Sequence, residues 1–127
     1  MNKKMLFALQ FVAACIIGGA GVLKFLGNPT DMLVFATLEM EPFGRYLIGT
    51  LELVAGGLLL SSSFAASGAL LALGTMIGAA IAHVTVLGFE VQGDGGLHIA
   101  LLSTVLVSCG SVLLQRRREL PLIGHTL

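Results

Sequence analysis

One acidic side chain, Glu52, lies near the middle of an apolar segment that is long enough to cross a membrane. The segment covers residues 43–62, and Arg45 is its only other charged residue. A transmembrane helix needs about 20 mostly apolar residues to cross a hydrocarbon core of roughly 30 Å. A carboxylate at the centre of that core costs on the order of 3 kcal/mol to insert. We therefore expect Glu52 to face protein, where it is either paired with a cation or protonated.

The composition of the whole chain is that of a membrane protein. Of its 127 residues, 56% are hydrophobic and only 11% are charged, and the mean hydropathy is +0.97. Soluble domains carry about 25% charged residues. The seven basic and seven acidic residues cancel, and no basic stripe with interleaved aromatic residues is present. The chain is therefore expected to contact the lipid bilayer and to bind no nucleic acid.

Four apolar runs, separated by short polar turns, indicate the fold. They cover residues 5–26, 43–62, 66–87 and 97–115. Between the first two runs, Thr30 or Asp31 can cap a new helix after Pro29, and residues 32–40 are too few to span a membrane. Each short connection reverses the chain direction. The sequence therefore predicts one all-α domain, residues 1–127, that is a polytopic membrane protein. Its predicted form is an up-down-up-down four-helix transmembrane bundle with a short interfacial helix between helices 1 and 2.

Small and charged residues alternate along one face of the second run. Arg45, Gly49, Glu52 and Gly56 follow one another at spacings of four, three and four, so they share one side of a helix. Glycine on such a face lets two membrane helices approach closely. This face is expected to press against neighbouring helices and to carry a polar site between them.

The first run also has a stripe that is expected to face the bundle. Its members are Gln10, Ala14, Ile17, Gly21 and Lys24, at spacings of four, three, four and three. Gln10 is the only strongly polar side chain in residues 5–23. We therefore expect Gln10 and Lys24 to meet other helices rather than lipid.

Small side chains in the later part of the chain are predicted to be buried as well. Gly74 and Gly78 form a GxxxG spacing that Ala82 continues, which indicates close helix packing in the third run. Cys15 and Cys109 lie in different apolar runs and form neither a CxxC pair nor a metal-binding spacing. Both cysteines are therefore predicted to act as small buried hydrophobic side chains.

Six polar side chains form the candidate functional set. If the four spans alternate in direction, all six lie toward the same side of the membrane. They are Lys24, Arg45, Tyr46, Glu52, His83 and His98. Lys24 is the predicted partner of Glu52, because its flexible side chain can reach inward from the membrane edge. Arg45 is the weaker candidate, since it lies about 10 Å from Glu52 along the same helix at a rise of 1.5 Å per residue.

The chain resembles the DoxX-like family of small four-helix membrane proteins. The matching segments are Gly-Ala-Gly-Val-Leu-Lys24-Phe-Leu and Pro42-Phe-Gly-Arg-Tyr-Leu-Ile-Gly49-Thr-Leu-Glu52-Leu-Val-Ala-Gly56-Gly-Leu-Leu-Leu, with Gly49-x-x-Glu52-Leu as the most specific part. Lys24 and Glu52 match the family pattern, whereas His83 and His98 are not assigned to it. Namesake relatives are membrane subunits associated with thiosulfate to quinone oxidation. The resemblance therefore implies an accessory subunit of a membrane oxidoreductase, with a soluble or membrane partner that supplies the dehydrogenase chemistry.

The polar set allows three interpretations. In the first, Lys24 pairs with Glu52 only to hold two helices in register, and the protein is a non-catalytic scaffold or assembly factor. In the second, the set forms a quinone or small-ligand pocket in the outer leaflet, where Glu52 exchanges protons and Lys24, Arg45 or His83 bonds a carbonyl oxygen. In the third, His83 and His98 bind a metal or haem.

Two histidines without a further ligand motif are a weak metal-binding pattern. We therefore predict no metal site, disfavour haem, and keep a quinone as the candidate cofactor. The sequence contains no self-contained catalytic motif, so it does not decide whether the chain is an enzyme. It also leaves open whether the chain forms a homo-oligomer.

The basic residues predict the orientation of the chain in the membrane. Lys3 and Lys4 lie near one terminus and Arg116-Arg-Arg118 near the other, whereas only Lys24 and Arg45 border the opposite side. Cytoplasmic segments of membrane proteins carry the excess of Lys and Arg. The sequence therefore predicts a multi-pass protein of a bacterial-type inner or plasma membrane with both termini in the cytoplasm.

This orientation can be tested with a reporter enzyme that is active only outside the cytoplasm. Fused after Gln115, the reporter should be silent, because that site follows the last span on the cytoplasmic side. Inserted at Gly93, it should be active. The reverse pattern would place the polar set on the cytoplasmic side.

Overall fold

The computed structural model describes all 127 residues, and every regular element in it is helical. The elements are α1 (Lys3–Leu26), α2 (Pro29–Thr37), α3 (Phe43–Leu59), α4 (Ala65–Ala82), the π-helix η1 (His83–Leu87), α5 (Leu97–Arg116), and the 3₁₀ helices η2 (Arg117–Glu119) and η3 (Gly124–Thr126). The helix η1 continues α4 without a break. The predicted all-α class is confirmed.

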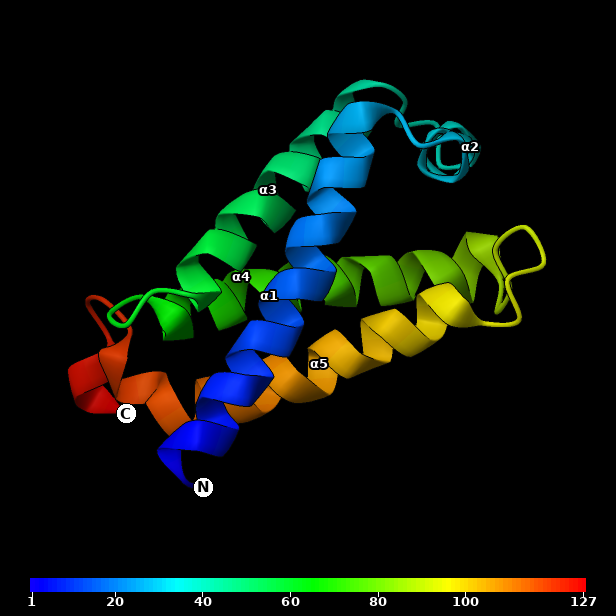
Figure 1. Cartoon of the computed structure of the whole chain (residues 1–127). Helices are drawn as coiled ribbons and strands as arrows, with labels where there is room; N and C mark the ends of the chain where they lie inside the picture. The colour runs from blue at the N-terminus through cyan, green and yellow to red at the C-terminus, as the bar shows by residue number, and fades with distance from the viewer.

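The four long helices are arranged as two pairs. α1 packs against α3 and α5, and α4 packs against the same two helices. In Figure 1, α1 runs beside α3 and α4 runs beside α5. The two pairs lie close together at the end that carries both termini and diverge toward the end that carries α2.

Small side chains make the contact between the pairs close. Ala13 of α1, Ala55 of α3, and Ala69 and Ala72 of α4 are fully buried in one cluster, which Val105 of α5 joins. Large apolar side chains such as those of Phe7, Leu47 and Ile81 lie instead on the outside, where they are 56–60% exposed. Small residues inside and large apolar residues outside are typical of helices that pack in lipid.

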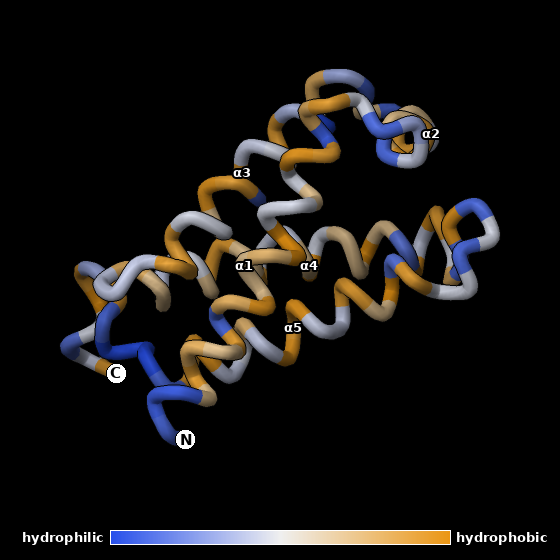
Figure 2. Tube along the Cα trace, viewed as in Figure 1, coloured by the Kyte–Doolittle hydropathy of each residue, from blue (hydrophilic) through white to orange (hydrophobic).

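Three helical segments are long and apolar enough to cross a membrane. They are Lys3–Leu26, Ala65–Leu87 and Leu97–Glu119. Figure 2 shows hydrophobic residues along these segments and hydrophilic residues gathered toward their ends. The predicted second span is shorter than expected, since α3 has 17 residues and ends at Leu59 rather than at residue 62. The Ser61 hydroxyl oxygen accepts hydrogen bonds from the backbone N–H groups of Ser63 and Phe64, which forms a turn there.

The predicted short helix between the first two apolar runs is present with different bounds. It begins at Pro29 rather than at residue 32, because the side chain of Asn28 accepts a hydrogen bond from the N–H of Thr30 and caps it. Proline fits the first helical position, where no N–H is needed. The helix ends at Thr37 and packs against α1, α3 and η1. It therefore lies over the end of the helix pairs where they diverge.

Two predictions about small residues were wrong. A Cβ atom on Gly74 or Gly78 would meet no atom within 4 Å, so the GxxxG spacing of α4 packs against nothing in this chain. The close approach of α4 occurs at Gly68 instead, where a Cβ atom would lie 2.6 Å from the backbone nitrogen of Leu59. Cys15 is exposed whereas Cys109 is buried. Cys15 follows a residue of the inward stripe, and the 100° step of a helix turns it outward.

The contact at Gly68 can be tested with one substitution and a matched control. Gly68→Ala should lower the stability of the protein by about 1–3 kcal/mol, because the new methyl group meets the backbone of α3. Gly57→Ala, at an exposed helical position with no atom within 4 Å, should be neutral or slightly stabilising. Thermal unfolding in mild detergent, followed by circular dichroism, measures both. Equal melting temperatures for the two variants would contradict a close contact between α3 and α4 at Gly68.

Candidate functional site

A cavity of about 630 Å³ lies where the two helix pairs diverge. Residues of all four long helices line it, together with residues of α2 and of the loop before α5. Of its 27 lining residues, 18 are hydrophobic. Ligand pockets commonly combine such apolar walls with a few placed polar groups. The cavity is therefore the candidate functional site, and its polar groups decide what it can hold.

The central polar contact joins α1 to α3. The ammonium nitrogen of Lys24 lies 2.8 Å from Oε1 of Glu52, and Glu52 is only 2% exposed. Asp31 of α2 approaches the same ammonium group, with Oδ1 at 3.8 Å. Lys24 is thus the partner that the sequence favoured over Arg45. Asp31, which the sequence analysis treated only as a helix cap, is a second carboxylate of this group.

Glu52 is not fully satisfied by this contact. The ammonium group of Lys24, 2.8 Å from Oε1, is the one donor that reaches its carboxylate. An ionised carboxylate has room for about four hydrogen bonds. Glu52 also lines the cavity, so a molecule inside the cavity can donate a further hydrogen bond to it.

Arg45 and Tyr46 do not belong to this site. Arg45 binds Glu41 one turn earlier, with Nε and Nη2 each 2.8 Å from Oε1, and it donates a hydrogen bond to the carbonyl oxygen of Lys24. Tyr46 packs beside it, with the Arg45 guanidinium carbon 4.5 Å from the centre of the tyrosine ring. Neither residue lines the cavity. Arg45 therefore ties the start of α3 to the end of α1 and leaves Lys24 free to bind Glu52.

His83 and His98 both line the cavity, and each has one ring nitrogen already engaged. Nδ1 of His83 lies 2.9 Å from the carbonyl oxygen of Gly88, and Nδ1 of His98 lies 2.6 Å from Oδ2 of Asp94. A carbonyl or carboxylate oxygen only accepts, so each Nδ1 carries the proton. Nε2 is the nitrogen that stays available in both rings. No group of three or more His, Cys, Asp or Glu side chains is placed to hold a metal ion.

Asp94 organises the loop on which His98 depends. Its carboxylate accepts hydrogen bonds from the backbone N–H groups of Val91, Gly96 and His98 as well as from the His98 ring. These donors, those of His98 foremost, hold the pKa of the Asp94 carboxyl well below its ordinary range. Hydrogen bonds to the charged form favour that form. Asp94 is therefore ionised across the physiological range and fixes the first turn of α5.

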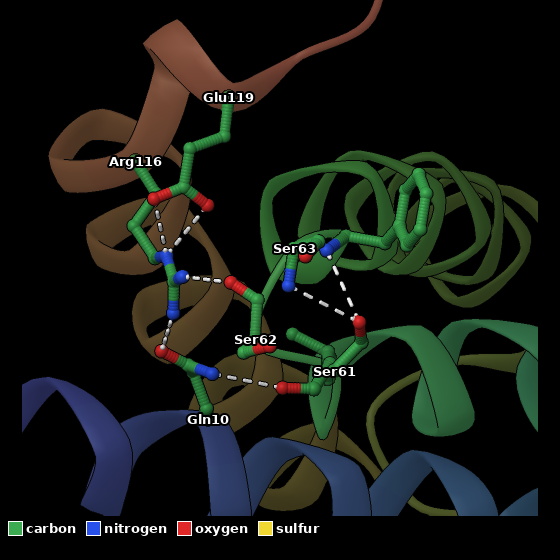
Figure 3. Close-up of polar contacts among 8 residues, drawn as sticks. Gln10, Ser61, Ser62, Ser63, Arg116 and Glu119 are labelled. Carbon is green, nitrogen blue, oxygen red and sulfur yellow. Dashed lines mark hydrogen bonds and ion pairs between the residues drawn. The ribbon is translucent and has the colours of Figure 1, made fainter.

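A second polar cluster closes the opposite end of the molecule (Figure 3). Gln10 donates to the carbonyl oxygen of Leu59 over 2.9 Å and accepts from Nη1 of Arg116 over 2.8 Å. The same guanidinium group donates to the carbonyl oxygen of Ser62 and to the carboxylate of Glu119. The isolated Gln10 in an apolar run was the available sequence indication, but its partner Arg116 was not predicted. This cluster ties α1, α3 and α5 together where the helix pairs meet.

The contribution of Asp94 depends on pH in a defined direction. A folded-state pKa below the ordinary value of 3.8 stabilises the protein at higher pH, and this stabilisation is lost as the pH falls below that value. Asp94→Asn should therefore lower the melting temperature at neutral pH and by a smaller amount under acidic conditions. Circular dichroism in detergent at both pH values measures this, with exposed Glu90→Gln as the control from the same loop. An unchanged melting temperature at neutral pH would contradict the assignment.

Comparison of the chain with protein-family models, with curated proteins and with solved structures finds no match in any of the three. The resemblance to the DoxX-like family therefore stays a prediction that rests on the motifs around Lys24 and Glu52. The function of this chain is therefore inferred from the chemistry of the residues that line the cavity.

Proposed function

We propose that the protein is an integral membrane protein that binds a small amphipathic molecule in the cavity between its helix pairs. Its three long apolar segments support a location in the membrane. α3 is the fourth span in this proposal, because 17 residues at 1.5 Å per residue cover about 26 Å, close to the thickness of a hydrocarbon core. With both termini in the cytoplasm of a bacterial-type cell, the cavity faces the outer leaflet.

The observation that carries the proposal is the state of Glu52. A carboxylate that is 2% exposed, lines a cavity of about 630 Å³ and is reached by a single donor, Lys24, is costly for the protein by itself. A ligand that donates a further hydrogen bond to this carboxylate offsets part of that cost. Ionisable groups inside membrane proteins commonly mark ligand or proton pathways.

The accessory role in a membrane oxidoreductase follows from the DoxX-like resemblance, which makes a quinone the first ligand to examine. The apolar walls suit an isoprenoid or alkyl tail, and Lys24, Glu52 and His83 provide groups for a polar ring. In this role Glu52 would take up and release the proton that accompanies electron transfer, while a partner subunit carries the electrons. The chain itself would hold the quinone.

A purely structural role is the second candidate, and one observation favours it. The Lys24–Glu52 pair lies beside the closest approach of α1 and α3, where a Cβ atom on Gly21 would come within 2.9 Å of the carbonyl oxygen of Gly49. A buried polar pair at such a contact can fix the register of two helices. In this role the protein would be a scaffold or assembly factor.

Two substitutions at one position separate these candidates. If Glu52 serves a ligand, Glu52→Gln should fold normally but lose bound molecule and cellular function, because an amide cannot exchange a proton at ordinary pH. If Glu52 only fixes packing, Glu52→Gln should keep both the fold and the cellular function. Glu52→Ala should then destabilise the protein by roughly 3 kcal/mol or more, because it leaves Lys24 unpaired. The measurements are thermal stability in detergent, a complementation assay, and mass spectrometry of molecules extracted from the purified protein.

A pair of glycine substitutions provides the control for the cavity itself. Gly19 lines the cavity and Gly110 does not, and a Cβ atom on either would meet no atom within 4 Å. Gly19→Leu should fill part of the cavity and so reduce the amount of molecule extracted from the purified protein. Gly110→Leu should leave that amount at the wild-type level. Equal amounts from both variants would contradict binding at this cavity.

A further inference from the structure

We propose that the cavity selects molecules whose polar end donates hydrogen bonds and carries no negative charge. The chemical class is a lipophilic donor, such as a protonated long-chain amine or the reduced, hydroxyl-bearing form of a quinone. This inference rests on the proposed function and adds the specificity of the same site. It follows from a count of the donors, acceptors and charges that the cavity contains.

Most of the polar groups in the cavity wall are acceptors. The carboxylate of Glu52 is reached only by the ammonium group of Lys24 and has room for further hydrogen bonds. The hydroxyl of Thr75 gives its only hydrogen to the carbonyl oxygen of Ala72, 2.9 Å away, and keeps its lone pairs. His83 donates from Nδ1 to the carbonyl oxygen of Gly88, so Nε2 is an acceptor whenever the ring is neutral. A ligand that donates satisfies these groups, and one that only accepts does not.

The donors in the wall are fewer. The ammonium group of Lys24 is held between Glu52 at 2.8 Å and Asp31 at 3.8 Å. The side-chain oxygen of Asn28 caps α2, which leaves its amide NH₂ group as the other donor. Nε2 of His98 becomes a donor only when that ring is protonated. A ligand with a carboxylate or phosphate would have to compete with two carboxylates for Lys24.

The fixed charges favour the same class of ligand. One cation, Lys24, faces the two carboxylates of Glu52 and Asp31. Outside the wall, the guanidinium group of Arg45 is neutralised by Glu41. The side chain of His98 is paired with the ionised Asp94, so a proton on His98 only balances that carboxylate. The region therefore has an excess of negative charge, which attracts a cation and repels an anion most strongly where water is scarce.

The test compares probes that differ only in the polar end. The full-length protein is placed in phospholipid nanodiscs, and binding of radiolabelled decylamine is measured by scintillation proximity at neutral pH. Unlabelled decylamine should displace the label at a concentration at least about tenfold lower than decanoate, which has the opposite charge. Decylubiquinol and decylubiquinone form the second pair, because the reduced form has two hydroxyl donors and the oxidised form has none. A preference for the quinol over decylamine would identify the quinol as the source of the donor.

Variants assign the preference to the cavity. Glu52→Gln should weaken decylamine binding by about tenfold or more. The amide carries no negative charge, and its NH₂ group donates where a carboxylate oxygen would accept. Asp31→Asn, nearer the edge of the cavity, should weaken it by a smaller factor and provides a second test if Glu52→Gln does not fold. Glu90→Gln removes an exposed carboxylate outside the cavity and should bind like the wild type.

The outcomes distinguish this inference from the proposed function. If decanoate or decylubiquinone binds as tightly as its donor-bearing counterpart, the donor preference is wrong while ligand binding stands. Unchanged binding in both Glu52→Gln and Asp31→Asn would also overturn it. If no probe binds above the level of protein-free nanodiscs, the proposed function fails together with the inference.

Discussion

The contact between Lys24 and Glu52 is the interaction on which the rest of the structure depends. It puts two opposite charges 2.8 Å apart in the wall of a mostly apolar cavity, and it joins α1 to α3. Separating a buried pair of this kind leaves an uncompensated charge and is strongly destabilising. Arg45, which neutralises Glu41 and binds the backbone of α1, holds the neighbouring turn in place. The position of α3 beside α1 is therefore determined by charge as well as by small residues.

The two ends of the molecule differ in packing, and this difference produces the cavity. At the terminal end, Arg116 and Gln10 tie three helices together over a cluster of small buried side chains. At the other end the pairs diverge, with α2 and the loop ordered by Asp94 at the opening (Figure 1). Thr30 of α2 donates a hydrogen bond to Gln92 of that loop over 2.8 Å.

Part of the candidate site could be predicted because few groups in an apolar chain can compensate a buried carboxylate. Lys24 was identified from its long side chain and its place at a helix end, and the inward faces of the first two long helices followed from helical spacing. Asp31 and the pairing of His98 with Asp94 were missed, because both depend on where a short helix and a loop fold back. Arg45 and Tyr46 were assigned to the site because the alternating spans place them on the same side of the membrane as Lys24. Arg45 also shares a helix face with Glu52, but it has a nearer carboxylate in Glu41.

The sequence by itself determined the class and the local structure of this protein. Apolar runs of spanning length require helices, since a backbone in lipid must satisfy its own hydrogen bonds. The tertiary structure alone decided which small residues are in contact, because Gly68 and the Gly74–Gly78 spacing look alike in sequence and differ only in what faces them. It also decided that the helix pairs diverge and leave a cavity, and that Glu52 lines this cavity with Lys24 as its one donor. Crossing geometry and hydrogen-bond alignment arise from the packing of whole helices, which no local pattern specifies.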